Sequence, residues 1–405
     1  MNNFVFDSRT KIYFGHETEK NIGKILKEFN ANNIIFVYGK SSIKKSGLYD
    51  TVIKSLNEEN IKFNEIPGVE ANPKVSLVRK GVKLAKEVNP DLILAVGGGS
   101  VIDTAKAIAA GYYLDCDPWK LSTHEVKPEK VLPVGVILTI AAAGSELSNS
   151  CVITNEETNV KNGFNSDLIR PKFVVEDPEL TFTVSKYQTA CGITDILMHT
   201  LERFLTDTKH SYFPDEMAIG LMKSVLKASK RVMKDPNHYN GRASLMLASS
   251  FSHNGLTGLG GNFYFTVHKL EHIVSGMFDN VAHAAGLSVL YPAWAKYVYK
   301  EIPVKFARIA TDVFNLEPIH DKFTSEMIGS KSIIDYEKTA LLGIEEMKKF
   351  FKSLGMPVSF KDLNIDSSSF EEIANRITKN NTVKVAGFKE LDYNDVINIL
   401  KLAEK

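Results

Sequence analysis

The chain has few cysteines, and none is spaced for a metal site or a disulfide framework. Its three cysteines, Cys116, Cys151 and Cys191, lie far apart and form no CxxC pair. This spacing argues against both a thiolate zinc site and a disulfide framework. A reducing, cytoplasmic location is therefore expected.

The chain also lacks an excess of either charge and any long apolar run. Its 49 Lys and Arg are balanced by 48 Asp and Glu, which gives no general attraction to nucleic acid or to an anionic membrane. No uncharged apolar run approaches the roughly 20 residues needed to span a bilayer. The N-terminal MNNFVFDSRTKIYFGHE has no signal-peptide pattern. We therefore expect a soluble protein whose partners are small molecules.

The length and the hydrophobic pattern predict two domains. With 405 residues, 44% of them apolar, the chain can form two packed cores. Up to residue 185, short β-branched runs such as NNIIFVYG alternate with helical patterns, as in a parallel sheet covered on both faces. Beyond that point, long 3.6-residue periodicities dominate. The prediction is an α/β domain over residues 1–185 and an all-α domain over residues 186–405.

A glycine loop follows the apolar run of LAVGGGSVIDTAKAIAAG (94–111). Glycines let the backbone approach an anion closely, and the first N–H groups of the following helix would face its phosphates. This pattern indicates a Rossmann-like, dinucleotide-binding domain. The alternative is a tight turn at Gly97–Gly99 with an ordinary capping box between Ser100 and Asp103. The loop is not a GxGxxG fingerprint, because Ile102 replaces its third glycine.

The segment after the run IIFVY bears on the choice between NAD and NADP. It reads GKSSIKK (39–45), and no acid occurs before Asp50. An acid here would bind the ribose 2′-OH of NAD, whereas small hydroxyls and lysines suit the 2′-phosphate of NADP. These residues favour NADP, although NAD stays possible because lysines in a surface loop are often simply solvated.

Three segments carry residues suited to a metal site. Asp195 and His199 are four apart, as are His268 and His272, so each pair shares one face of a helix. A third segment, NVAHAAGLSV, offers His283. Each histidine alone could be an ordinary, partly buried side chain. Imidazoles with a carboxylate suit Fe(II), Zn(II) or similar ions, and the sequence does not choose among them.

Taken in order, these motifs resemble the iron-dependent (group III) alcohol dehydrogenases, and most closely their NADPH-dependent butanol dehydrogenase branch. The resemblance runs through almost the whole chain and includes the following segments: GGGSVIDTAKAIAAG, GSELSNSCVITNEETNVKNGF, GITDILMHTLERF, SHNGLTGLG, HKLEHIVSGMF and AHAAG. It implies an N-terminal dinucleotide-binding domain and a C-terminal helical domain that binds the metal.

The resemblance also implies roles for individual residues. Asp195, His199, His268 and His283 would bind the metal, Fe(II) or alternatively Zn(II), and His272 would be a catalytic residue in the proton path or the substrate pocket. The cofactor contacts would be Gly39, Ser41, Ser42, Lys44, Gly98, Gly99, Ser100, Asp103, Thr139 and Lys161. Relatives commonly dimerise through N-terminal strands, so NFVFDSRTKIYFG predicts a homodimer.

The implied activity is hydride transfer between NADP(H) and a small alcohol or aldehyde such as butanol or butyraldehyde, with the metal polarising the carbonyl. Two alternatives stay open. One is a zinc-dependent polyol dehydrogenase of the glycerol type, which would prefer NAD and an acid near residue 40. The other is a non-catalytic scaffold that binds metal or nucleotide.

Several positions depart from the family pattern. His268 and His283 lie one residue further apart than is usual, which makes His283 the least secure ligand. Tyr264 and Phe265 stand where many relatives have Asp and Trp, and Ala143 stands where a Thr is common. These departures predict a substrate pocket of altered shape and polarity.

Overall fold

The computed structural model describes residues 1–209, 211–321 and 333–405. These residues fold into two compact units. The sheet unit comprises Phe6–Gly192 and Ala228–Gly255, and the helical unit comprises Met1–Val5, Ile193–Lys227 and Leu256–Lys405. The units do not coincide residue for residue with a division at 185/186, which stays a prediction about the domains.

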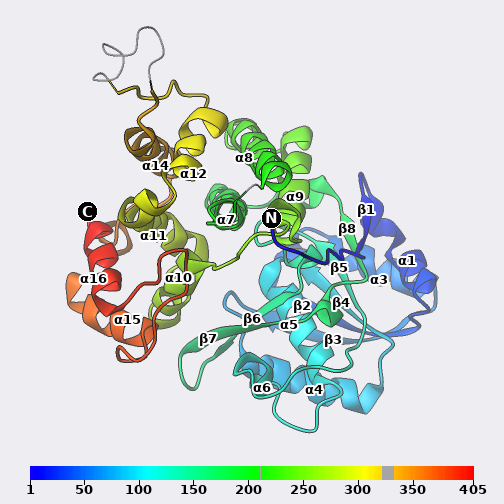
Figure 1. Ribbon diagram of the computed structural model, residues 1–405. Helices are drawn as coiled ribbons and strands as arrows, with labels where there is room; N and C mark the ends of the chain where they lie inside the picture. The colour runs from blue at the N-terminus through cyan, green and yellow to red at the C-terminus, as the bar shows by residue number, and fades with distance from the viewer. Residues whose placement is uncertain (210, 322–332) are drawn as a thin grey trace. The chain divides into compact units, whose positions relative to one another are not determined.

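A parallel sheet forms the centre of the sheet unit (Figure 1). Among the described residues it has six strands in the order β1-β8-β5-β4-β2-β3. Their bounds are β1 Lys11–Phe14, β2 Asn33–Gly39, β3 Lys62–Val69, β4 Leu92–Gly97, β5 Val134–Leu138 and β8 Phe173–Glu176. The predicted fold class, α/β at the N-terminal side and helical at the C-terminal side, is confirmed.

Alternate residues of the central strands enter two different cores. Ile35 and Val37 of β2 pack on one face of the sheet, whereas Ile34 and Phe36 pack on the other. The helices α4 (Val75–Val88) and α5 (Gly99–Gly111) cover the first face, and α1 (Ile22–Glu28) and α3 (Leu48–Glu58) cover the second. This double coverage explains why the strands are almost continuously apolar.

The strand order contains a switch point between β2 and β4. From β2 the chain crosses to β3 on one side, and from β4 it crosses to β5 on the other side. In open α/β sheets, ligands bind beyond the carboxyl ends of the strands at such a point. Those ends are Gly39 and Gly97, which begin the two segments that the sequence singled out.

The remaining elements complete the two units. The sheet unit also contains a hairpin, β6 (Ser150–Asn155) and β7 (Val160–Asn165), with α2 (Ser42–Lys45), α6 (Trp119–Ser122) and α9 (Tyr239–His253). The other helices are α7 Lys186–Phe204, α8 Tyr212–Val232, α10 Thr266–Met277, α11 His283–Val298, α12 Pro303–Arg308, α14 Tyr336–Ser353, α15 Phe370–Ile377 and α16 Tyr393–Leu402. No helix in the described part of the chain is long and apolar enough to cross a membrane.

Two buried carboxyl groups share one hydroxyl inside the sheet unit. Ser250 Oγ lies 2.7 Å from Glu146 Oε1 and 2.7 Å from Glu176 Oε1. A hydroxyl has one proton to donate, so one of the two contacts needs a proton on a carboxyl group. Burial, followed by the charge of Glu146, raises the pKa of Glu176 to about 8. Glu176 therefore stays protonated near neutral pH.

This proton predicts a pH dependence of stability. The pKa of Glu176 is about 8 in the folded state against a reference value of 4.5, so the unfolded chain releases this proton first as pH rises. Its contribution is fully present below about pH 4.5 and is lost by about pH 8. Glu176→Gln, which cannot ionise, is expected to gain stability over the wild type across this window. The gain is on the order of 1 to 3 kcal/mol.

Thermal unfolding between about pH 5 and about pH 8 measures this difference. Glu179→Gln is a matched control, because Glu179 is exposed on the neighbouring turn and pairs with His16. A difference between Glu176→Gln and wild type that stays constant with pH would contradict the prediction.

Candidate functional site

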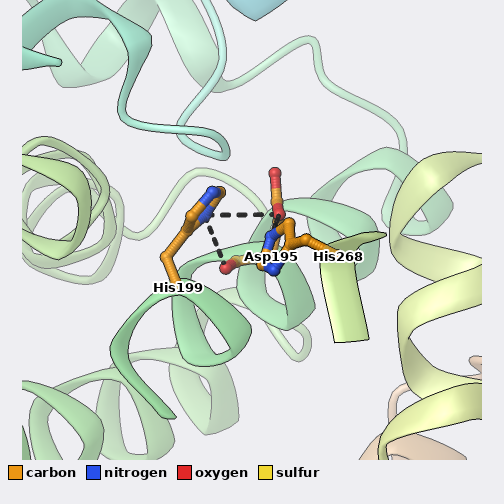
Figure 2. A group of neighbouring side chains, drawn as sticks. All are labelled: Asp195, His199 and His268. Carbon is orange, nitrogen blue, oxygen red and sulfur yellow. Dashed lines mark hydrogen bonds and ion pairs between the residues drawn. The ribbon is translucent and has the colours of Figure 1, made fainter. Parts of the chain in front are cut away.

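The structure brings the four predicted metal ligands together in the helical unit. Asp195 and His199 come from α7, His268 comes from α10, and His283 is the first residue of α11. Asp195 Oδ1 lies 3.4 Å from His199 Nδ1, 3.8 Å from His268 Nε2 and 3.9 Å from His283 Nε2. Figure 2 shows Asp195, His199 and His268 facing one another. The extra residue before His283 does not remove it from the cluster.

Each histidine ring is held through its Nδ1 atom. His199 Nδ1 lies 3.0 Å from the backbone oxygen of Asp195, and His268 Nδ1 and His283 Nδ1 contact the carboxylates of Glu202 and Glu271. An acceptor at Nδ1 places the proton there and leaves Nε2 as the basic nitrogen. Such partners orient histidines that bind a metal and make them better ligands.

Glu202 does more than orient one ring. Its Oε1 accepts the backbone N–H of Val267 at 2.7 Å, and its Oε2 accepts that of His268 at 3.2 Å. These are free donors of the first turn of α10, where a carboxylate also meets the positive end of the helix dipole. One side chain of α7 thus fixes both the start of α10 and the direction of His268.

Glu271 has a comparable position between α10 and α11. It is fully buried, and a Cβ at Gly286 would lie 2.7 Å from Glu271 Cγ. Only glycine at this position lets α11 approach the carboxylate closely enough for His283 to contact it. The segment AHAAG therefore supplies both the histidine and the space for its partner.

The charges of this cluster fit a divalent cation. Among the described residues, no hydrogen bond reaches the buried atoms Asp195 Oδ1 and His268 Nε2. Burial alone would raise the pKa of Asp195, but His199, His268 and His283 bring it below its usual range. Burial lowers the pKa of His268, but Glu202 and Asp195 outweigh it and raise the value to about 9. The cluster attracts positive charge, and its nitrogen and oxygen donors suit Fe(II) or Zn(II).

His272 and Phe265 lie beside the cluster. The ring centroid of His272 is 5.3 Å from that of His283 and 6.5 Å from that of His268. Phe265 has a left-handed backbone, with φ 49°, immediately before α10, and its ring centroid is 5.4 Å from that of His268. This conformation is unusual for an aromatic residue and is typical of functional sites. Phe265 therefore places an apolar ring against the candidate ligands.

The glycine loop lies at the switch point of the sheet unit. Gly98 precedes α5, which begins at Gly99, and Ser100 lies in its first turn. A Cβ at Gly98 would come within 2.2 Å of Ile140 Cγ2, and one at Gly99 within 3.3 Å of the Ala143 side chain. Thr139 donates its backbone N–H to Gly97 at 3.1 Å. Glycine at these two positions therefore lets the loop pack closely against Ile140 and Ala143, and its contact with a phosphate stays a prediction.

Asp103 and Lys106 of α5 form hydrogen bonds with the segment 145–152 of the sheet unit. Asp103 Oδ1 accepts from Ser145 Oγ at 2.6 Å, and Asp103 Oδ2 accepts from the Val152 backbone at 3.0 Å. The Nζ of Lys106, fully buried, donates to the backbone oxygens of Ser145, Ser148 and Ser150 at 2.7 to 3.0 Å. Both oxygens of Asp103 are therefore engaged with the chain, and its contact with a cofactor stays a prediction.

The other predicted cofactor residues lie near the end of β2 or on β7. Ser41, Ser42 and Lys44 are exposed beyond Gly39, and Lys44 Nζ is 4.7 Å from the centroid of the Tyr49 ring. Lys161 Nζ of β7 lies 3.1 Å from Asn72 Oδ1, in the loop after β3. These placements agree with a nucleotide at the switch point but do not by themselves assign the contacts.

An acid from the neighbouring strand reaches this edge. The sequence after β2 has no acid before Asp50, but the structure places Glu70 beside Lys40, with Nζ and Oε1 2.5 Å apart. Glu70 follows β3, the neighbouring strand, so its position could not be read from the segment after β2. An acid therefore does stand near residue 40.

Comparison with known sequences settles the family. Residues 9–178 match the family model described as iron-containing alcohol dehydrogenase, and residues 189–403 match its C-terminal counterpart. The chain belongs to the iron-containing alcohol dehydrogenase family. The family resemblance drawn from the motifs is thus confirmed. Its assignment to an NADPH-dependent branch is not.

Individual relatives agree on the family and differ in cofactor. A probable NADH-dependent butanol dehydrogenase of Bacillus subtilis is 38% identical, with 99% of each chain covered. The NADPH-dependent aldehyde reductase YqhD of Escherichia coli is 30% identical over 93% of each chain. A crystal structure of an NADH-dependent butanol dehydrogenase from Thermotoga maritima has 36% identity, a TM-score of 0.92, and coverage of 100% of this chain and 99% of that one.

Sequence reasoning missed the two acids that hold the histidines. Glu202 lies seven residues after Asp195 and three after His199, so all three project from one face of α7. Glu271 lies three residues after His268 in the same way. This spacing was a usable signal, although the partners of both acids lie on another part of the chain.

Removing the charge of Glu202 tests its role. Glu202→Gln keeps the size of the side chain but removes the anion that holds His268 and the start of α10. The affinity for Zn(II) or Fe(II) is expected to fall about 10- to 100-fold. Competition with a chelator of known affinity measures the change.

Glu345→Gln, a partly exposed acid on α14 paired with Lys296, is the matched control. Circular dichroism shows whether both variants are folded. A folded Glu202→Gln protein with wild-type metal affinity would rule out the positioning role.

Proposed function

We propose that this protein is a metal-dependent alcohol dehydrogenase or aldehyde reductase that transfers hydride between NADP(H) and a small alcohol or aldehyde such as butanol or butyraldehyde. Membership of the iron-containing alcohol dehydrogenase family supports the reaction class. The observation that carries the proposal is the buried cluster of Asp195 with three histidines whose Nδ1 atoms are already engaged. Such a cluster has no need of a side-chain nucleophile.

The residues of the cluster have separate tasks. Asp195, His199, His268 and His283 would hold the cation, which would supply Lewis-acid polarisation of the carbonyl, and a bound nicotinamide would supply or accept the hydride. Glu202 and Glu271 keep the protons of His268 and His283 on Nδ1. Phe265 limits the access of water.

His272 is placed to move a proton. Its ring lies beside those of His283 and His268, yet it is not part of the set around Asp195. We assign it the catalytic task of exchanging the alcohol proton with solvent or of lining the substrate pocket.

The finer assignments are supported to different degrees. The family description supports Fe(II), with Zn(II) possible from the donor set. Ser41, Ser42 and the lysines after β2 support NADP, whereas Glu70 and the NADH in the names of the butanol dehydrogenases support NAD. We propose that NADP is used and that NAD is also accepted.

A homodimer is the proposed assembly. β1 lies at one edge of the sheet and pairs with β8 on its inner side. An edge strand with free backbone groups can pair with the same strand of a second copy. This supports association through the N-terminal strands.

Direct assay tests the activity. Protein loaded anaerobically with Fe(II) is expected to oxidise NADPH in the presence of butyraldehyde, as followed by nicotinamide absorbance. His268→Ala removes a ligand and opens a cavity at the cluster, so activity is expected to fall at least about 1,000-fold. His320→Ala, an exposed histidine of the same unit, is the control.

The outcomes separate the proposal from its alternatives. Zn(II)-dependent turnover of glycerol with NAD, and none of butyraldehyde, would indicate a polyol dehydrogenase. Binding of nucleotide and metal without turnover of a panel of aldehydes and alcohols would indicate a non-catalytic scaffold.

The role of His272 is tested separately from metal binding. His272→Ala is expected to keep the bound metal and to lower kcat about 10- to 100-fold, as for loss of a proton-transfer group. Metal content and kcat are measured on the same preparation. Loss of metal together with activity would instead make His272 a ligand, and an unchanged kcat would exclude it from the proton path.

A further inference from the structure

Two opposite charges meet at the carboxyl edge of the sheet. Lys40 directly follows β2, and Glu70 directly follows β3. The two strands are parallel neighbours, with Gly39 opposite Val69, so the chain places both side chains at the same edge. Lys40 Nζ is 2.5 Å from Glu70 Oε1.

This edge is where the adenosine ribose of a nucleotide is expected. In the proposed binding mode the glycine loop after β4 would receive the pyrophosphate, and β2 lies beside β4 on the side away from β5. In nucleotide-binding sheets of this kind, the residue after the strand next to the glycine loop meets the ribose 2′ position. A carboxylate there accepts a hydrogen bond from the 2′-OH, whereas a cationic side chain there binds a 2′-phosphate. This chain presents both.

The ion pair is easily opened. The side chains of Lys40 and Glu70 are 68% and 48% exposed, and pairs this exposed contribute little to stability. A 2′-phosphate carries up to two negative charges and can compete with one carboxylate for the ammonium group. Lys44, which the family resemblance implies as a cofactor contact, lies over the rings of Tyr38 and Tyr49. Lys40, in contrast, directly follows the end of β2 and is the lysine closest to it in sequence.

We propose that the Lys40–Glu70 ion pair determines the choice between NAD and NADP. With a 2′-OH, Glu70 keeps Lys40 neutralised, and the nucleotide meets no net charge. With a 2′-phosphate, Lys40 turns to the phosphate and Glu70 remains as a repelling charge. Lys40 thus favours NADP, Glu70 opposes it, and the chain accepts both. This inference rests on the proposed binding of a nicotinamide nucleotide by the sheet unit.

Two nucleotide fragments test the pair without metal or turnover. Adenosine 2′,5′-bisphosphate carries the 2′-phosphate and AMP does not, and calorimetric titration of the full-length protein measures both affinities. Glu70→Gln is expected to bind the bisphosphate about three- to tenfold more tightly, whereas Lys40→Gln weakens it by a similar factor. The affinity for AMP is expected to change by less than about twofold in both variants.

Glu58→Gln is the matched control, because it removes the same charge from an exposed pair, Lys54–Glu58. α3 ends at Glu58 shortly before β3 begins, so this pair lies at the opposite, amino edge of the sheet. The control is expected to bind both fragments like the wild type. In a double variant, Lys40→Gln with Glu70→Gln, the effect of the Glu70 change is expected to be smaller than in the single variant, because the repulsion is removed but no ammonium remains to be released.

The outcomes distinguish this inference from the function on which it rests. Equal effects of Glu70→Gln on both fragments, or no effect on either, would overturn the role of the pair while leaving nucleotide binding intact. If the wild-type protein bound none of the four nucleotides, that is, neither of the two fragments and neither NAD nor NADPH, the proposed cofactor site itself would be wrong.

Discussion

The contact between Glu202 and the start of α10 is the interaction on which the candidate metal centre depends. A single buried carboxylate accepts hydrogen bonds from two backbone N–H groups and contacts the Nδ1 atom of His268. It therefore links α7, which carries Asp195 and His199, to α10 at a fixed register. Without that anion, three donors would be left buried and unsatisfied, which costs more than a single hydrogen bond gains. The residues that would touch the metal are thus held by one that does not.

In the sheet unit, the two sides of the glycine loop differ in how firmly they are held. The order of strands places the ends of β2 and β4 at one switch point. On one side of the glycine loop, Asp103 and Lys106 hold the segment from Ser145 to Val152 through hydrogen bonds from a single turn of α5. On the other side, the edge is exposed and carries charges of both signs. A firmly packed glycine loop is therefore combined with an exposed edge that carries charges of both signs.

The periodic parts of the molecule could be predicted from the sequence, and the parts that depend on pairing between elements could not. Continuous β-branched runs indicated the doubly covered sheet, and the four-residue spacing of Asp195 and His199 indicated a shared helix face. Glu202 and Glu271 were overlooked because their partners lie on other helices. Glu70 was overlooked because it reaches Lys40 from the neighbouring strand. The residues that tune a site are thus harder to find than those that form it.

At position 286, helix propensity and side-chain packing favour different residues. Alanine in a helix is more favourable than glycine by roughly 1 kcal/mol, so helix propensity alone would favour alanine at this position. Here the methyl group would collide with Glu271, the partner of His283. The clash with a buried side chain outweighs the helix propensity of alanine, so glycine at this single position serves both the packing of α11 and the orientation of His283.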